Sequence, residues 1–276
     1  MGAYLRPRGL EEALQALTRP FTVLAGGTDF YPARVGRSII EDVLDIAGIA
    51  ALRGISETEV GWRLGATTTW AELAEASLPP LFDGLKQAAR EVGGRQIQNS
   101  GTIAGNICNA SPAADGVPPL LSLDADVELA SRDGTRRLPL ASFISGVRTT
   151  ALQRGELVVA LHVPRPRAEA RSAFVKLGAR RYLVISIAMA SVVVEVAQGK
   201  VAAARVAVGA CSPVAQRLPE LEQALIGASF DAHLAERVEP SHLAPLSPID
   251  DIRGSAAYRG DATLVLLRRL LTKVAA

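Results

Sequence analysis

The chain has 276 residues, of which 49% are apolar, and this is enough to bury a sizeable core and to form two domains. Its 30 basic and 28 acidic residues give a formal net charge of +2, which excludes the clustered positive charge of a nucleic-acid-binding protein. Its two cysteines are too few for a disulfide framework or for the four ligands of an iron–sulfur cluster.

No basic start followed by an apolar run opens the sequence, so no signal peptide is predicted. The longest nearly uncharged apolar run, residues 182–194, is shorter than the roughly 20 residues that span a bilayer. We therefore expect a soluble, cytoplasmic protein without membrane insertion.

The first unit, residues 1–55, is predicted to alternate helices and strands. Apolar residues at helical spacing form one face: Leu10, Ala13, Leu14 and Leu17. The run FTVLAGG (21–27) is typical of a strand that enters a tight turn, and DVLDI (42–46) is a plausible second strand. Thr28 or Asp29 can cap a helix that begins at this point. This αβαβ order favours a parallel sheet.

The second unit, residues 56–168, is predicted to combine strands at 62–66, 125–131 and 156–164 with one amphipathic helix. That helix is marked by Leu81, Leu85, Ala88, Ala89 and Val92, and it stops at Gly93 and Gly94. The stretch 95–119 is dense in Gly, Asn, Ser and Pro and is predicted to be a loop.

Residues 164–169 are rich in Pro and Arg and are predicted to separate two domains, 1–168 and 169–276. In the second domain, residues 182–210 favour a β-hairpin around the turn AQGK. Helices are predicted at PELEQALIG (219–227) and at the C-terminus, where Leu264, Leu267, Leu271 and Val274 repeat at helical spacing.

Two glycine-containing segments are candidate binding sites. In Val23–Phe30, Gly26 and Gly27 allow a sharp turn and close approach to a ligand, and a following helix N-terminus adds free N–H groups. Together they suit a pyrophosphate, although the same pattern also occurs in a simple tight connection.

The second segment is NSGTIAGNICNASPAAD (99–115). It offers many neutral donors and acceptors without fixed positive charge, which fits phosphate, ribityl and flavin contacts; a polar surface loop is the alternative. Neither G-x-G-x-x-G nor G-x-x-x-x-G-K-[ST] occurs, so a nucleotide would have to be held in another way.

The pair AGGTD (25–29) and TIAGN-x-x-NASPAAD (102–115) resembles the FAD-binding subunit of the xanthine dehydrogenase and carbon monoxide dehydrogenase family. The resemblance continues through LGATTTW (64–70), ELVVALHVP (156–164), FVKLGARR (174–181) and DDIRGSAAYR (250–259). It implies an α+β fold: a two-subdomain FAD-binding domain of the PCMH type, followed by a C-terminal α+β domain with a small antiparallel sheet and helices.

The resemblance also implies which residues bind FAD. Residues 25–29 and 102–106 would wrap the pyrophosphate, Asp115 would bond the flavin or ribityl region, and Val158 and Lys176 would line the flavin end. The implied cofactor-binding set is Val23, Leu24, Ala25, Gly26, Gly27, Thr28, Asp29, Phe30, Thr102, Ile103, Ala104, Gly105, Asn106, Asp115, Val158 and Lys176. No catalytic side chain and no metal ligand are implied. Ala104 stands where the family usually has Gly, which could narrow the approach to the pyrophosphate.

The function implied is electron transfer in a multi-subunit oxidoreductase. A molybdopterin-binding subunit would oxidise xanthine, another N-heterocycle or an aldehyde, and 2Fe-2S clusters on an iron–sulfur subunit would carry electrons to FAD on this chain. The flavin would then reduce NAD⁺ or another acceptor, in a dimer of heterotrimers (a heterohexamer). The alternatives are a stand-alone FAD-dependent oxidoreductase and a non-catalytic nucleotide-binding assembly subunit.

Overall fold

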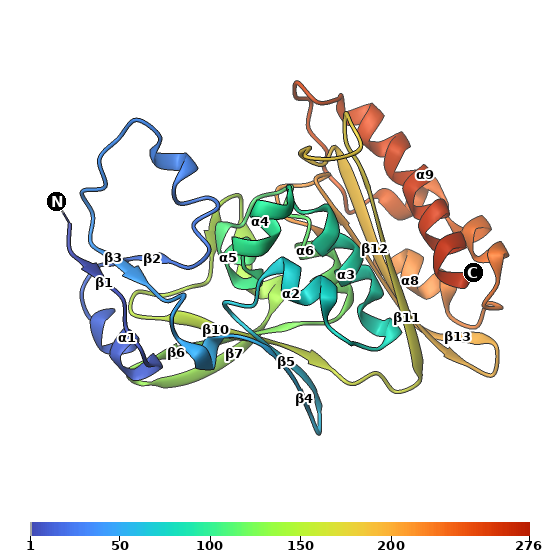
Figure 1. Ribbon diagram of the computed structural model, residues 1–276. Helices are drawn as coiled ribbons and strands as arrows, with labels where there is room; N and C mark the ends of the chain where they lie inside the picture. Colours follow the sequence, from blue (N-terminus) through green and yellow to red (C-terminus); the bar gives the residue numbers. More distant parts are fainter. Residues whose placement is uncertain (1) are drawn as a thin grey trace.

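The computed structural model describes residues 2–276, which form three units that follow one another across the molecule (Figure 1). Each unit is built around its own sheet, and a fourth, two-stranded sheet lies in the second unit. Among the described residues, no helix is both long enough and apolar enough to cross a membrane.

The first unit is a parallel sheet with the strand order β1-β3-β2. Its elements are β1 (Tyr4–Leu5), α1 (Leu10–Ala16), β2 (Thr22–Leu24), the 3-10 helix η1 (Pro32–Arg34), β3 (Val43–Asp45) and the 3-10 helix η2 (Ala50–Leu52). The buried side chains of Ala13 and Leu17 pack in one cluster with Leu44 of β3. The predicted helix α1, both strands and their parallel pairing are confirmed.

The predicted helix at Thr28 or Asp29 is wrong. Residues 28–31 form turns, and only the short η1 follows. Pro32 explains the difference, because a helix that starts at Thr28 needs a backbone N–H at residue 32 and proline has none.

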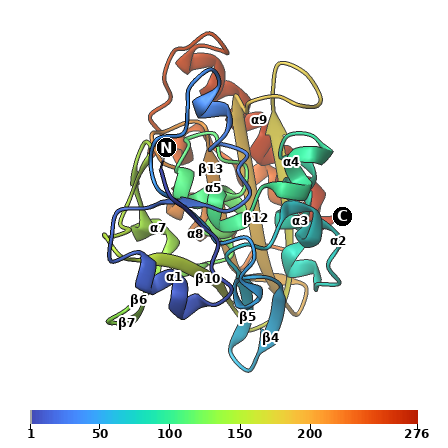
Figure 2. The ribbon, with the colours of Figure 1, turned by 60° about the vertical axis from the view of Figure 1, so that its left-hand side comes forward.

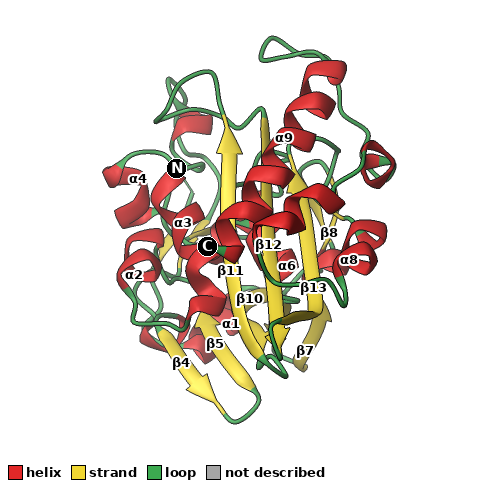
Figure 3. Ribbon diagram, turned by 90° about the vertical axis from the view of Figure 1, so that its right-hand side faces the viewer, coloured by secondary structure: helices red, strands yellow, loops and turns green. Residues whose placement is uncertain are grey.

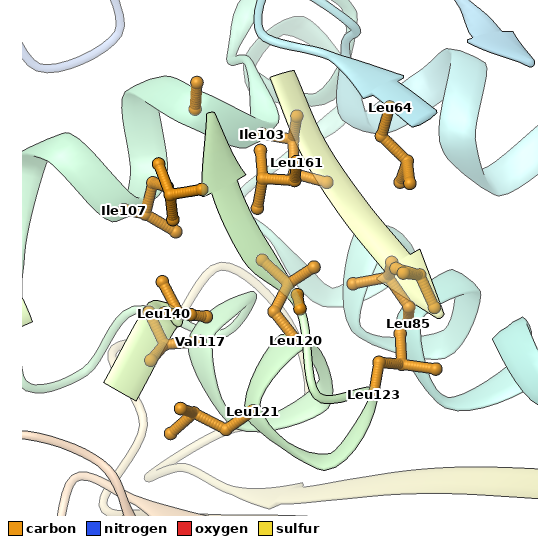
Figure 4. Packing of buried hydrophobic residues seen from close by; sticks show 14 of the residues in the cluster. Leu64, Leu85, Ile103, Ile107, Val117, Leu120, Leu121, Leu123, Leu140 and Leu161 are labelled. Atoms are coloured by element: carbon orange, nitrogen blue, oxygen red, sulfur yellow. The ribbon is translucent and has the colours of Figure 1, made fainter. Parts of the chain in front are cut away.

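The second unit is an antiparallel sheet in the order β4-β5-β10-β6-β7. Its strands are β4 (Ile55–Thr58), β5 (Gly61–Gly65), β6 (Asp126–Ser131), β7 (Gly134–Pro139), β8 (Ile144–Gly146), β9 (Thr149–Thr150) and β10 (Leu157–Pro164). Its helices are α2 (Trp70–Glu75), η3 (Pro80–Phe82), α3 (Asp83–Glu91), α4 (Arg95–Ser100), α5 (Ile103–Asn109), α6 (Val117–Ser122) and α7 (Leu140–Phe143). Figure 4 shows the core, where Leu64 and Leu161 of the sheet meet Ile103 of α5 and Leu120 of α6.

The prediction of a loop over residues 95–119 is wrong, because α4, α5 and the start of α6 lie there. Ile103 and Ile107 are four residues apart on α5, and both are fully buried. The glycine and asparagine residues around them make this short apolar repeat hard to recognise in the sequence. Packing on the sheet stabilises α5.

The third unit is an antiparallel sheet in the order β11-β12-β13-β14 with helices on its outer face. Its elements are β11 (Glu169–Leu177), β12 (Ala188–Ala197), β13 (Lys200–Gly209), β14 (Gln216–Arg217), α8 (Pro219–Leu225), η4 (Ala232–Arg237), η5 (Pro240–Leu243) and α9 (Ala256–Ala275). Gln198 and Gly199 both have positive φ, as the tight turn between β12 and β13 requires. The predicted hairpin is therefore confirmed, although residues 182–187 precede β12 as an irregular segment.

Helix α9 crosses one face of this third sheet (Figure 3), and its buried Leu267, Leu270 and Leu271 belong to the core there. Helices α3 and α6 of the second unit pack on β11, β12 and β13 from the other side. Helices of the second unit thus cover one face of the sheet of the third unit, and this contact joins the two units.

Candidate functional site

A cavity of about 580 Å³ lies between the first and second units. Its wall comes from the turn after β2, from α4 and α5, and from the start of β10. In Figure 2 the first unit comes forward and lies in front of α5. All the residues that the sequence predicts as cofactor contacts line this cavity except Ile103, Asp115 and Lys176.

The turn after β2 is held by two glycines in different ways. A Cβ atom on Gly26 would overlap the carbonyl oxygen of Ser100, so Gly26 lets this turn pack directly against the segment before α5. Gly27 has φ +73°, and a Cβ atom there would lie 2.6 Å from the ring of Tyr31. The two predicted segments therefore meet through backbone contact that needs glycine.

The backbone N–H groups of this turn are available for a ligand. Within residues 2–276, those of Gly26, Gly27, Thr28 and Asp29 donate no hydrogen bond, whereas that of Tyr31 donates to the Gly27 carbonyl at 3.1 Å. Consecutive free N–H groups in a turn form a concave site that favours an anion. The donors belong to the turn itself and not to a helix that follows it.

The second segment differs, because its N–H groups already have acceptors. Those of Ile103 and Ala104 donate to the carbonyls of Thr68 and Ala66, at 3.0 and 3.3 Å. Gly105 donates to the side-chain oxygen of Thr102 at 3.1 Å, as an N-capping threonine requires. The start of α5 is therefore tied to the segment after β5 and contributes shape to the cavity.

Asn106 is the polar side chain that this part of α5 offers to a ligand. It lines the cavity, and its side-chain oxygen is buried without a hydrogen-bond partner among the described residues. A buried acceptor left unpaired costs about 1–3 kcal/mol, so a donor group of a ligand would be favourable at this point.

One hydrogen bond joins the two segments at the edge of the cavity. The side-chain amide of Asn109 donates to the Asp29 carboxylate at 2.8 Å, and Arg148 donates to the Asn109 carbonyl at 3.1 Å. The turn after β2 is thereby fixed to the end of α5.

Asp115 and Lys176 form a buried ion pair of 2.7 Å outside the lining of this cavity. Ser186 donates to the other oxygen of Asp115 at 2.5 Å, and Lys176 also donates to the carbonyls of Glu91 and Val184, each at 3.3 Å. Burial raises the pKa of Asp115 more than Lys176 and Ser186 lower it. Ile103, the third exception, points into the core.

Sequence reasoning missed most of the apolar wall of the cavity. These residues are Ile46, Ala66, Trp70, Val92, Ile97 and Leu157. Trp70 is nearly fully buried at the start of α2, and it is the last residue of the motif LGATTTW (64–70). That motif is the sequence signal for this wall of the cavity. The carbonyls of Ala66 and Thr68 within it also accept hydrogen bonds from the first residues of α5.

The cavity suits an elongated ligand with one anionic group. It combines free N–H groups at the turn after β2, an unpaired acceptor on Asn106 and an apolar wall. A few placed polar groups on an apolar surface are typical of cofactor sites. A flavin dinucleotide has the matching groups: a pyrophosphate, hydroxyl donors and flat rings.

Comparison with known proteins gives matches over nearly the whole chain. Residues 1–166 match the family "FAD binding domain in molybdopterin dehydrogenase", and residues 173–274 match "CO dehydrogenase flavoprotein C-terminal domain". The xanthine dehydrogenase FAD-binding subunit of Escherichia coli O157:H7 is 30% identical over 280 residues, covering 99% of this chain and 96% of that protein. The nicotinate dehydrogenase FAD-subunit of Eubacterium barkeri is 30% identical, covering 98% and 95%.

Solved structures give the same result. A chain of the reconstituted CO dehydrogenase from Oligotropha carboxidovorans superposes with a TM-score of 0.90 at 27% identity, covering 100% of this chain and 98% of the other. The match spans all three units.

Proposed function

The chain belongs to the FAD-binding subunits of the molybdenum hydroxylases, the xanthine and carbon monoxide dehydrogenase family, and on this premise we propose a specific FAD site and a place in electron transfer. The cofactor-binding residues that we propose are those of the cavity between the first and second units, together with the buried pair of Asp115 and Lys176 outside its lining. The observation that carries this proposal is the meeting of unbonded N–H groups at 26–29 with the unpaired oxygen of Asn106 in one cavity.

Each part of the cavity has a distinct task. The N–H groups of Gly26, Gly27, Thr28 and Asp29 hold the pyrophosphate, since neutral donors can balance its charge without a cation. The side-chain oxygen of Asn106 would accept a hydrogen bond from a hydroxyl group of the cofactor. The apolar wall, including Trp70 and Val158, excludes water from the bound rings.

Asp115 and Lys176 act at the flavin end. Their 2.7 Å pair is buried, and burial raises the pKa of Asp115 while Lys176 and Ser186 act to lower it. When bound, FAD supplies the redox chemistry by accepting and passing on electrons. The protein residues position it and tune its surroundings.

The partners follow from chemistry that this chain lacks. Its two cysteines cannot hold an iron–sulfur cluster, so electrons that arrive through such clusters come from a cysteine-rich partner subunit. A molybdopterin-binding subunit would oxidise the organic substrate, with xanthine, another N-heterocycle or an aldehyde as candidates. We propose a dimer of such heterotrimers, with NAD⁺ or another acceptor reoxidising the flavin.

Cofactor analysis tests this proposal. The purified chain should release one FAD per molecule by mass analysis, and dithionite should bleach its flavin absorbance. The chain alone should oxidise no purine or aldehyde, whereas the complex isolated from the native host should do so. FMN at full occupancy, or a lone chain that oxidises substrate, would contradict the proposal.

A further inference from the structure

The motif DDIRGSAAYR (250–259) has no part in the cavity between the first and second units. In the structure it forms the loop before α9 and the first turn of that helix, which crosses the third sheet (Figure 3). Ser255 caps α9 by accepting the N–H of Tyr258 at 3.1 Å. The start of α9 is therefore fixed, and its first turn directs Arg259 into the interior, where the side chain is only 3% exposed.

The guanidinium group of Arg259 joins three segments of the chain. It donates to the Asp251 carboxylate at 2.7 Å, to the Ala210 carbonyl at 3.0 Å and to the Ile187 carbonyl. These acceptors lie in the loop before α9, directly after β13 and directly before β12. The planar fork of N–H groups in arginine lets one side chain hold several acceptors in fixed directions, which the compact ammonium group of lysine cannot do.

Two of the three segments also contact the stretch of chain before α6. The hydroxyl of Ser186, the residue before Ile187, donates to Asp115 at 2.5 Å. The backbone N–H of Ala210 donates to the Pro112 carbonyl at 2.9 Å. The buried arginine therefore holds both of the segments that make these contacts.

Neither segment has regular secondary structure at this point. Ile187 is the last residue of the irregular stretch 182–187 that precedes β12. Ala210 has φ +63°, a conformation that is disfavoured for alanine and that its surroundings must hold. Donors at both carbonyls restrict both residues, and the hydroxyl of Ser186 thereby keeps its direction toward Asp115.

The same arginine carries a cost that packing alone does not explain. The Nε–H group of Arg259 is buried and has no acceptor among the described residues. An apolar side chain of similar volume would avoid that cost, because a buried donor without a partner destabilises a fold. The arginine at this position is therefore better explained by the groups that it holds in place than by its contribution to the core.

We propose that Arg259 is a positioning residue for the flavin end of the cofactor site, which keeps the Ser186 hydroxyl hydrogen-bonded to Asp115. Arg259 does not line the cavity, and it acts through the two backbone carbonyls that it holds. The link to the flavin rests on the proposed function, whereas the link to Asp115 rests on the contacts of the chain itself. Burial raises the pKa of Asp115, and Lys176 and Ser186 lower it, so loss of the Ser186 contact should raise that pKa further.

The test is the titration of the Asp115 carboxyl in the FAD-loaded protein, followed by infrared difference spectroscopy with Asp115→Asn to assign the band. Arg259→Met keeps the apolar stem of the side chain but removes its donors, and Ser186→Ala removes the hydroxyl directly. Each should lower the acid dissociation constant of Asp115 about tenfold, the effect of one hydrogen bond to a charged group. The double variant should lower it no further, because both changes break the same contact.

Two further variants complete the set. Arg259→Lys keeps the charge without the fork and should give a smaller change in the same direction; it takes the place of Arg259→Met if that variant does not fold. The matched control is Arg217→Met, because Arg217 is also a partly buried cation with several acceptors, none of which belongs to the segments that Arg259 holds. This control should lower stability and leave the titration of Asp115 unchanged.

The proposal is overturned if both Arg259 variants leave the titration of Asp115 as in the parent protein, or if the effects of the Arg259 and Ser186 changes are fully additive. The midpoint potential of the flavin is measured in the same samples. A shift to more positive values supports the action on the flavin, because a neutral Asp115 favours the negative charge that reduction adds nearby. A changed titration with an unchanged potential contradicts the proposed place of the flavin but leaves the role of Arg259 toward Asp115 intact.

Discussion

The two glycine-containing segments look alike in sequence but differ in what they can offer a ligand. The turn at residues 26–29 has backbone N–H groups that donate no hydrogen bond within residues 2–276. At residues 103–106 every backbone N–H is already bonded to Ala66, Thr68 or Thr102. We therefore propose the first as the anion site, whereas the second shapes the cavity and presents the Asn106 side chain. A motif gives the residues, but only the structure tells which donors are free.

The largest effect is expected at Gly27. Gly27→Val should abolish FAD retention, because the side chain meets Tyr31 and the residue has positive φ, so the turn that presents the free N–H groups must change. Absorbance of the purified protein at flavin wavelengths measures the loss.

Gly36→Val is the matched control for that change. Gly36 has φ +75°, close to that of Gly27, but a Cβ atom there meets nothing within 4 Å. This variant carries similar backbone strain and should keep its FAD. Equal loss of FAD in both variants would mean that strain in this loop, and not the turn at 26–29, controls binding.

A smaller effect is expected at Asn106. Asn106→Leu removes the unpaired oxygen, so FAD should bind about tenfold more weakly, in line with one lost hydrogen bond to a buried group. The apo protein should be no less stable, since an unsatisfied buried acceptor is gone. Titration of apo protein with FAD and urea unfolding measure the two quantities. The exposed Asn99→Leu serves as control, and an equal loss there would refute the role of Asn106.

The smallest effect on FAD is expected at Thr102. Thr102→Ala removes the cap of α5 and should lower the free energy of unfolding by about 1 kcal/mol. FAD affinity should fall only slightly, because Thr102 acts on the helix and not on the pyrophosphate. Thr69→Ala, which removes the cap of α2, should cost similar stability. A loss of FAD as complete as in Gly27→Val would mean that both segments contribute equally to FAD binding. That result would contradict the difference between their backbone N–H groups.

The parts of the fold that the sequence predicts are those with long or clear apolar repeats. The face Leu10, Ala13, Leu14 and Leu17 gives α1, and the run before the turn AQGK gives β12. Helix α5 escaped prediction because it has only seven residues, and tertiary packing of Ile103 and Ile107 stabilises it. The helix predicted after Gly27 does not form, because Pro32 lacks the backbone N–H that a helix starting at Thr28 needs.

The candidate site also has parts that the sequence predicts and parts that it does not. The sequence locates both glycine-containing segments, since glycine and neutral polar residues mark them. It cannot reveal that Thr68 and Ala66 use the amides of the second segment, because that bond joins residues 35 and 38 positions apart. The apolar wall was missed for a similar reason: Trp70 and Ile46 reach the cavity only once the first two units have packed together.

Residue-resolved amide hydrogen exchange, with and without FAD, tests the central claim most directly. The account predicts that FAD slows exchange at Gly26, Gly27, Thr28 and Asp29, whose N–H groups gain acceptors, and leaves residues 103–106 nearly unchanged because they are already bonded. Slowed exchange at residues 103–106 with no change at 26–29 would place the pyrophosphate on the second segment and contradict it.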